Sequence, residues 1–462
     1  MIERQNNVIF AVISNALGIL IMLITTKAMT YYMTTAEYGE FRLIFNVASF
    51  LSLFLILGRD SLILTISDKR IAEALNECFY GIITVFIGVF ILYVFSDTII
   101  TVFFKSKISS LNYYLGLLMI LVWGIYNLLT PILRIKGEQN LIFLFNNFLL
   151  RFIRLPFFIL FIYLNFQYTS SYYSMIIGQL LLTIVLVAIV IRKSYIKNFS
   201  FNLKNYFHNF HISFFICINT LMFTLMTTMV VMLANINFSM TFVGIIDMVV
   251  MLTSLMMYPF IAYIKTIEPY LTKNTTELEQ FKFNKNKELS FIICLLSCVF
   301  LVLFSKFILG FFGNEYAIGY KLLIITSILF FFSSLLGPYP EWLNLNGYPR
   351  FTSCILILSI VTLFIVYYSL IDSFQYYTLG ISLGLSILEY RFLSYLVYLK
   401  LRPNSKFNFS TSSQNWKAAF ILITLSVLAS LNLPFVFCLL FFITIAFFYL
   451  KRSMVIINAK HN

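Results

Sequence analysis

The stretch Asn146–Phe158 reads Asn-Asn-Phe-Leu-Leu-Arg-Phe-Ile-Arg-Leu-Pro-Phe-Phe and lies within an apolar run long enough to cross a bilayer. Arg151 and Arg154 are therefore expected within the hydrocarbon region of the membrane, where a charged side chain is unfavourable. A charged side chain near the bilayer centre costs about 2.5–3.5 kcal/mol on insertion scales, so such residues normally face a bundle interior or a hydrated cavity. Asn147, Arg151 and Arg154 are spaced to share one face of a helix. The stretch predicts a membrane helix with a cationic face.

The composition indicates a protein that lies almost entirely in a membrane. The chain has 462 residues, of which 61% are hydrophobic and only 11% are charged, with a mean hydropathy of +0.92. These values exclude a soluble globular chain and a disordered one. The formal net charge of +14 fits cytoplasmic loops rich in Lys and Arg, so we expect no nucleic-acid partner. The apolar run after Arg4 lacks a cleavage site and predicts a retained first membrane helix.

The chain also lacks the residue groupings of a cofactor or metal site. Its six cysteines fall mostly inside apolar runs and form no Cys-x-x-Cys pair, so we interpret them as small buried hydrophobes. The only histidines are His208, His211 and His461, and none is grouped with acids. We therefore predict no catalytic residues, no metal, no cofactor and no enzyme activity.

The apolar runs predict an all-α polytopic membrane protein of about fourteen transmembrane helices. At about 20 residues per crossing, the expected spans are 8–30, 41–67, 78–96, 111–133, 141–164, 172–192, 211–235, 241–264, 288–312, 320–343, 352–371, 376–399, 416–432 and 434–450. Asn432 and Pro434 interrupt the last apolar run, so residues 416–450 could form two spans or a re-entrant hairpin.

The distribution of Lys and Arg predicts the orientation of these spans. Alternate gaps hold almost no basic residues, and Lys105 and Lys107 are the only ones well inside a loop on that side. The opposite side collects most of the others, including those of a charged linker at 265–287. We therefore expect both termini to be cytoplasmic.

A weak internal sequence repeat divides the chain into two similar halves. The turn at 36–41 matches the one at 240–245, and the helix end at 133–138 matches the one at 343–348, each in the same place and direction in its half. This is the parallel-repeat arrangement of many transporters. The expected parts are an N-terminal lobe at 1–192, a cytoplasmic linker at 193–210, a C-terminal lobe at 211–400, and two further helices with a tail at 401–462.

Several segments, in this order and spacing, carry a likeness to a known family. They are Asn15 and Gly18, Thr35-Ala36-Glu37-Tyr38-Gly39-Glu40-Phe41, Leu57-Gly58-Arg59-Asp60-Ser61, Gly313-Asn314-Glu315-Tyr316, and Leu343-Asn344-Leu345-Asn346-Gly347-Tyr348-Pro349-Arg350. Together they resemble the polysaccharide-transporter branch of the multidrug/oligosaccharidyl-lipid/polysaccharide (MOP) exporter superfamily, and within it the Wzx-type flippases of O-antigen or capsule repeat units.

The resemblance implies a fold, a substrate and partners. The fold would be two pseudo-symmetric six-helix lobes around a central cavity, with extra C-terminal helices. The substrate would be an undecaprenyl-pyrophosphate-linked oligosaccharide for O-antigen (lipopolysaccharide) or capsule biosynthesis, moved by alternating access to the outer leaflet of a bacterial inner (plasma) membrane. Membrane lipids and the polysaccharide polymerase machinery are the implied partners.

The charges inside the spans supply candidate site residues. We expect a cationic, substrate-binding cavity, because arginine offers a permanently charged planar donor suited to phosphate oxygens; its residues are Arg59, Arg151, Arg154, Arg391, Lys27 and Asn147. Arg42, Lys306 and Lys321 should instead extend to the headgroups from the outer ends of their spans. The intramembrane acids are Asp60, Asp247 and Glu389, which either pair with an arginine or bind H⁺ or Na⁺ as a coupling ion. In the first half, Asp60 is the only acid set against three deep cations.

Other functions remain open on the sequence. Within the same superfamily the alternatives are a lipid II flippase resembling MurJ and a drug/cation antiporter, although an acidic cavity would suit cationic drugs better. From a different class, a polyprenyl-linked glycosyltransferase or an O-antigen polymerase would place Glu37 and Glu40 in an outer loop. The outer gaps are too short to hold a sugar acceptor, so we prefer an interfacial turn anchored by Tyr38.

Overall fold

The computed structural model describes residues 2–65, 71–192, 221–260 and 277–458, apart from short gaps at 106, 136–137, 139–140, 143, 222–223, 258–259, 347, 402–412 and 433. The expected linker at 193–210, most of the charged segment at 265–287, Cys217 and the three histidines lie outside this part. The chain divides into two compact units, Met1–Gly244 and Ile245–Asn462. Each unit is all-helical over its described residues.

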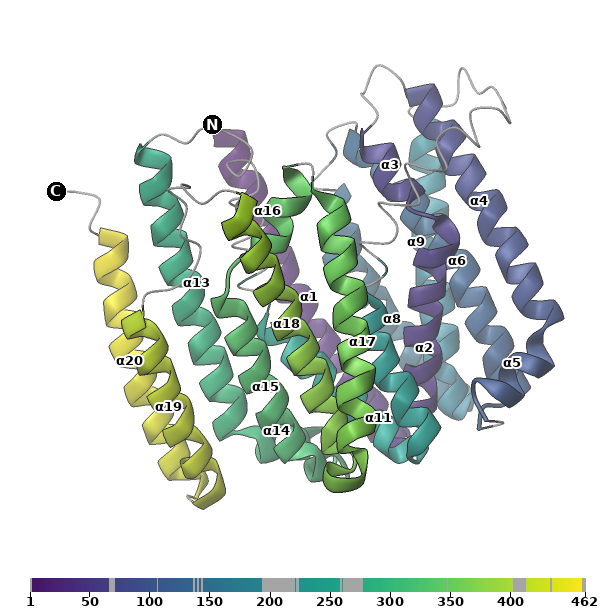
Figure 1. The fold of residues 1–462 in the computed structure, drawn as a ribbon. Helices are drawn as coiled ribbons and strands as arrows, with labels where there is room; N and C mark the ends of the chain where they lie inside the picture. The colour runs from purple at the N-terminus through teal and green to yellow at the C-terminus, as the bar shows by residue number, and fades with distance from the viewer. Residues whose placement is uncertain are drawn as a thin grey trace. The chain divides into compact units, whose positions relative to one another are not determined.

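Unit 1 is a bundle with α6 at its centre. Its helices are α1 (Ile2–Tyr32), α2 (Thr35–Ile56), α3 (Arg59–Thr65), α4 (Ile71–Val94), α5 (Ser96–Val102), α6 (Ser110–Ile135), the π-helix η2 (Leu144–Leu149), α8 (Leu150–Tyr163), the short η3 (Gln167–Thr169), α9 (Ser170–Arg192), Thr224–Asn237 and the start of α11 (Met240–Met256). α6 packs against α2, α4 and α9, and α8 packs against α9 (Figure 1).

Unit 2 begins within α11 and is built around α15 and α18. Its further helices are α13 (Glu277–Leu303), α14 (Ser305–Phe312), η5 (Tyr316–Gly319), α15 (Tyr320–Leu335), α16 (Tyr339–Leu345), α17 (Pro349–Phe374), α18 (Tyr377–Leu401), α19 (Ser413–Asn432) and α20 (Phe435–Asn458). α18 packs against both α15 and α17. The break expected at Asn432 and Pro434 is present, because α19 ends at Asn432 and α20 begins at Phe435.

These helices are long and apolar enough for a multi-pass membrane protein. Within the described residues, seven helices could each cross a bilayer, and α13 with α14, bent by 71° at their junction, could form an eighth span. Shorter apolar helices cover 17–32, 224–237, 240–256, 419–428 and 437–447. The all-α membrane architecture is therefore confirmed, whereas the number of fourteen spans stays a prediction.

The side chains of α9 are distributed as a membrane bundle requires. Leu181, Ile184 and Ile191 are exposed, whereas Ser174 and Gln179 are buried. A water-soluble helix would place these residue types the other way round. In a bilayer, small and polar residues pack between helices and the aliphatic side chains face lipid. The outer face of α9 is thus suited to hydrocarbon, and its small and polar residues lie inside the bundle.

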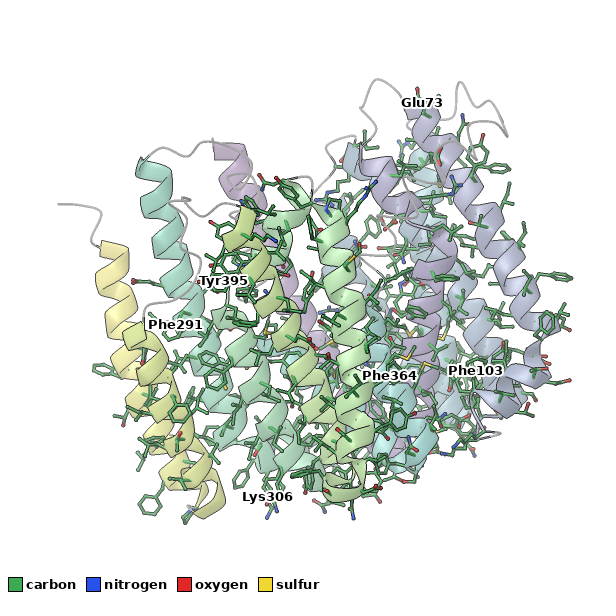
Figure 2. The ribbon with its side chains drawn as sticks, viewed as in Figure 1. Glu73, Phe103, Phe291, Lys306, Phe364 and Tyr395 are labelled. Carbon is green, nitrogen blue, oxygen red and sulfur yellow. The ribbon has the colours of Figure 1, made fainter. Side chains whose placement is uncertain are left out.

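The second expected span, 41–67, is not one continuous helix. Leu57 and Gly58 both have positive φ, 53° and 70°, and this left-handed step separates α2 from α3. Glycine adopts such a conformation without strain. The next helix, α4, begins at Ile71, ahead of the expected start at residue 78, and Glu73 lies in its first turn (Figure 2). The prediction of these two boundaries was wrong, and the shift brings Glu77 into the membrane helix.

Candidate functional site

Arg151 and Arg154 stand at the start of α8, directly after a π-helix. The π-helix Leu144–Leu149 occupies the first part of the expected span, and α8 continues it from Leu150. Short π-helical turns are often found at functional sites. Asn147 lies within this π-helical turn, so the spacing of an α-helix does not show whether it shares a face with Arg151. The side chain of Asn147 is outside the described part of the chain.

The two arginines have buried donors without hydrogen-bond partners. Nη1 of Arg151 and Nε of Arg154 are buried, and neither donates to any acceptor among the described residues. Leaving a buried polar group unpaired costs about 1–3 kcal/mol, and more when the group is charged. Arg42, Arg151 and Tyr126 all lie within electrostatic range of the Arg154 guanidinium. The arrangement concentrates positive charge, and Arg151 and Arg154 form no ion pair with an acid in the part of the chain that the structure describes.

Arg42 also lies within electrostatic range of Arg154, and its expected position at the headgroups stays a prediction. It is half-buried on α2, and its guanidinium lies 4.7 Å from the ring centre of Phe45. Arg42, Arg151 and Arg154 are called the cationic cluster below. Because they come from α2 and α8, only the packing of the bundle brings them together, and no spacing along the chain indicates it.

Neighbouring helices support the cationic cluster from two sides. The hydroxyl of Tyr126 on α6 donates to Oδ1 of Asn146 at 2.5 Å, which ties the π-helix to α6. On α9, a Cβ at Gly178 would lie 3.5 Å from Cγ of Arg154, so α9 packs directly against the arginine stem. The guanidinium groups are thus presented by packed helices and not by a loop.

Arg59 has a different environment from the cationic cluster. It begins α3, is fully buried, and forms an ion pair with Glu77 of α4, with the ring of Tyr80 5.6 Å from its guanidinium carbon. Glu77 lies outside the span expected from the sequence, which starts at residue 78. Asp60, which is half-buried, is therefore not the only acid of the first half. The charge of Arg59 is compensated within the protein.

Lys27 and the candidate residues of unit 2 complete the predicted set. Lys27 is half-buried on α1. In unit 2, Nη1 of Arg391 donates to the carbonyl of Gly337 at 3.2 Å, at the break between α15 and α16, and its guanidinium lies 4.5 Å from the Phe260 ring. Asp247 is buried, and Oε2 of the half-buried Glu389 has no hydrogen-bond partner among the described residues.

The structure thus divides the predicted residues between the two units. Arg59, Asp60, Lys27, Asn147, Arg151 and Arg154 belong to unit 1, and Asp247, Glu389 and Arg391 to unit 2. Lys306 and Lys321 are exposed, as expected for side chains that reach the headgroups; Figure 2 labels Lys306 on α14. Over the described ranges, no three His, Cys, Asp or Glu side chains come together as a possible metal site.

Comparison with known proteins gives a result for structure only. No family model and no curated protein sequence matches the chain. The solved structure of the lipid II flippase MurJ in an inward closed conformation matches with a TM-score of 0.70 at 14% identity, over 97% of this chain and all of MurJ. An outward-facing multidrug resistance MATE family transporter of the MOP superfamily matches with a TM-score of 0.58 at 14% identity, over 90% of this chain and 96% of that one.

The chain has the fold of the MOP-superfamily transporters. A third MOP transporter, from Pyrococcus furiosus, whose binding pocket is described as reversed in polarity, matches with a TM-score of 0.57 at 13% identity, over 86% of this chain and 95% of that one. These similar structures are flippases and transporters and not enzymes. The MOP fold agrees with the all-helical, multi-pass architecture described above.

Proposed function

We propose that this protein is a flippase for undecaprenyl-pyrophosphate-linked oligosaccharide repeat units of O-antigen or capsule, which it moves from the cytoplasmic to the outer leaflet by alternating access. The observation that carries the proposal is the pair Arg151 and Arg154, which lie close together in a unit of MOP fold, have buried donors without hydrogen-bond partners among the described residues, and form no ion pair with an acid there. An anionic ligand would satisfy these donors. A pyrophosphate is such a ligand, because guanidinium groups bind phosphate oxygens in bidentate geometry.

The charge of the cluster argues against a transporter of cationic drugs. Arg42, Arg151 and Arg154 would repel a cation, and Glu77, the buried acid of this unit with a known partner, is occupied by Arg59. The same argument favours substrates that carry phosphate. Arg59 then serves mainly to join α3 to α4, while the cationic cluster contacts the substrate.

A lipid II flippase is the second candidate, because the similar structure with a TM-score of 0.70 is one. Deletion with complementation distinguishes the two candidates. A strain lacking its repeat-unit flippase should accumulate undecaprenyl-linked repeat units on the cytoplasmic leaflet, and this chain should relieve the accumulation. If the chain instead rescued a strain depleted of its lipid II flippase and did not relieve the accumulation of repeat units, the lipid II flippase would be the better candidate.

Accumulation of single repeat units at the outer leaflet would instead indicate a polymerase. This outcome separates the transporter proposal from the membrane-enzyme alternative, because a polymerase consumes units that have already been flipped. The short outer connections between α1 and α2 and between α17 and α18 support the transporter.

The proposal includes an arrangement and an energy source. Residues 1–192 and 211–400 form the two lobes, 193–210 links them, and 401–462 adds two helices and a tail, with both termini on the cytoplasmic side of the bacterial inner membrane. Asp60, Asp247 and Glu389 are the candidates for H⁺ or Na⁺ coupling, and Asp247 and Glu389 lie in unit 2, apart from the cationic cluster. Unchanged translocation and ion dependence in Asp247→Asn would remove Asp247 from this role.

A further inference from the structure

Asn146 is an exposed polar residue of the π-helix that precedes α8. Among the side chains of this turn that the structure describes, Asn146 is exposed and the others, such as Phe145 and Phe148, are buried or half-buried. The lipid-facing side of α9 shows the reverse, because its exposed residues are aliphatic and its polar residues are buried. An amide is unfavourable in contact with hydrocarbon. The side of the π-helix that carries Asn146 is therefore suited to water or a polar ligand and not to lipid.

The orientation of the Asn146 amide is fixed by one hydrogen bond. The hydroxyl of Tyr126 on α6 donates to Oδ1 of Asn146 at 2.5 Å, and the Tyr126 side chain is only 2% exposed. The amide nitrogen Nδ2 makes no hydrogen bond to another described residue. A planar carboxamide has its acceptor on one branch and two N–H donors on the other. The bond to Oδ1 therefore directs the N–H donors away from the Tyr126 hydroxyl.

The same hydroxyl places this amide beside the cationic cluster. Tyr126 lies within electrostatic range of the Arg154 guanidinium, and so does Arg151. Nη1 of Arg151 and Nε of Arg154 are buried donors without hydrogen-bond partners among the described residues. Because Oδ1 of Asn146 is bonded to the hydroxyl, it does not serve as an acceptor for these guanidinium groups. The unused groups are thus all donors, which suits an anion with several acceptor oxygens.

We propose that Asn146 contacts the substrate directly, with Nδ2 donating to an oxygen of the diphosphate that Arg151 and Arg154 bind, and that Tyr126 is a positioning residue that holds the amide in this orientation. The inference rests on the proposed function and adds a neutral donor to its anion site. A diphosphate has acceptor oxygens on two phosphate groups, so one molecule can reach donors that are several ångströms apart. The spacing of an α-helix favours Asn147 instead, because it does not anticipate the π-helical turn.

A purely structural role for the Tyr126–Asn146 bond has different consequences. If the bond served only to fasten the π-helix to α6, the loss of either side chain would lower stability and leave the affinity for an anion unchanged. If Tyr126 holds Oδ1, its removal frees the amide to turn Oδ1 toward the guanidinium groups, where this acceptor competes with the ligand. The affinity for a diphosphate therefore separates the two roles.

The test measures binding of a short-chain polyprenyl diphosphate to the purified full-length protein in lipid nanodiscs, with the uncharged polyprenol of the same length as the baseline. The variants are Asn146→Leu, which has a similar size without the amide, Tyr126→Phe, which loses only the hydroxyl, and the two combined. Tyr113→Phe is the matched control. Its hydroxyl also lies on α6 and donates to the carbonyl of Leu92 at 2.9 Å, about 20 Å along the helix from Tyr126.

The wild type and Tyr113→Phe should bind the diphosphate equally. Asn146→Leu should bind it about tenfold more weakly, as expected for one hydrogen bond to a charged acceptor. Tyr126→Phe should lose about threefold, because the amide is still present. The combined variant should lose no more than Asn146→Leu alone, since the hydroxyl acts through the amide. Wild-type affinity in Asn146→Leu would overturn the inference, and losses that multiply in the combined variant would remove the positioning role of Tyr126.

A second measurement applies even if Asn146→Leu does not fold. In Asn146→Cys, the introduced thiol is treated with anionic and cationic thiosulfonate reagents of similar size, and the wild type gives the background from the native cysteines. The anionic reagent should react about tenfold faster because the cluster attracts it, and this preference should vanish when Arg151 and Arg154 are both replaced by Gln. The diphosphate should slow the reaction. Equal rates with the two reagents, or no protection by saturating diphosphate, would contradict the assignment.

The outcomes distinguish this inference from the function on which it rests. If the wild type binds the diphosphate no better than the polyprenol, the proposed function fails and the role of Asn146 fails with it. If the wild type binds the diphosphate and Asn146→Leu binds it equally well, only the role of Asn146 is wrong.

Discussion

Unit 1 holds its arginines in two contrasting environments. Arg59 is completely buried and forms an ion pair with Glu77, whereas Arg151 and Arg154 are half-buried and form no ion pair with an acid among the described residues. Each of the three also has at least one buried donor without a hydrogen-bond partner in that part of the chain, so the difference lies in the acidic partner. A buried charge without a partner is tolerated only when something else compensates it. The pair Arg59–Glu77 contains its own compensation and holds α3 against α4. In our proposal Arg151 and Arg154 obtain their compensation from an anionic ligand, which would separate a structural arginine from two binding ones.

Replacing the two arginines that α8 contributes to the cationic cluster should produce the largest loss of transport. Arg151→Gln together with Arg154→Gln removes two charged hydrogen-bonding groups, each worth about 1.5–3 kcal/mol, so substrate affinity should fall by about 10²–10⁴-fold. The measurement is binding of a polyprenyl diphosphate to the purified protein, with leaflet accumulation in the complemented deletion strain as the cellular readout. Protein level and membrane insertion should not change, and retained transport would reduce both arginines to packing residues.

Changes to the Arg59–Glu77 pair should instead affect the stability of the protein and leave transport intact. Breaking a buried pair by removing one partner costs about 3–5 kcal/mol, so Glu77→Ala should lower the thermal unfolding temperature in detergent strongly. Replacing both groups, as in Arg59→Met with Glu77→Leu, should recover most of that loss and retain transport. If the double variant regained thermal stability but did not transport, Arg59 would have to contact the substrate. The distinction between Arg59 and the arginines of α8 would then be wrong.

Arg42 tests whether the cluster extends to α2. Arg42→Gln leaves the two arginines of α8 in place, so we expect a drop in polyprenyl diphosphate affinity of about tenfold, equivalent to one hydrogen bond to a charged group. Lys321→Gln is the matched control, because Lys321 is an exposed cation at the start of α15. If both substitutions lowered the affinity by the same small amount, Arg42 would not belong to the binding site. The headgroup position expected from the sequence would then be the better interpretation.

Lys107 provides the smallest expected effect. Its ammonium donates to the carbonyls of Asn235 and Phe238, and burial, followed by repulsion from Lys105, lowers its pKa. Among the described residues this cation is partnered by neutral carbonyl groups, so its environment is intermediate between the two compared above. Lys107→Met should speed amide hydrogen exchange around residues 235–238 by about fivefold, in line with the loss of about 1 kcal/mol, and should leave substrate affinity unchanged. Unaltered exchange would mean that the lysine does not hold this segment.

The architecture could be predicted from sequence because its signal is local. Each apolar run of about 20 residues must become a helix that satisfies its own backbone in lipid. The described helices accordingly occupy the positions expected for them. The exceptions are the left-handed step at Leu57 and Gly58, the early start of α4, the 71° bend between α13 and α14, and the break between α15 and α16. Helix boundaries and bends of this kind depend on neighbouring helices.

The site could be predicted only in part. Arg151 and Arg154 were identifiable because charge in an apolar run is conspicuous. The proximity of Arg42 to Arg154 depends on how α2 packs near α8, which no spacing along the chain reveals. The place of Glu77 within a membrane helix depends on where α4 begins, and the π-helical turn that presents Asn146 gives no signal within an apolar run. These three assignments need tertiary structure.

The central claim is that Arg151 and Arg154 carry the pyrophosphate of a lipid-linked glycan across the membrane. Its most direct test is translocation of a labelled undecaprenyl-pyrophosphate oligosaccharide in proteoliposomes that contain the purified protein. The wild type should move the lipid between leaflets, Arg59→Met with Glu77→Leu should do so as well, and Arg151→Gln with Arg154→Gln should not. Translocation by the last variant at the wild-type rate would contradict the claim.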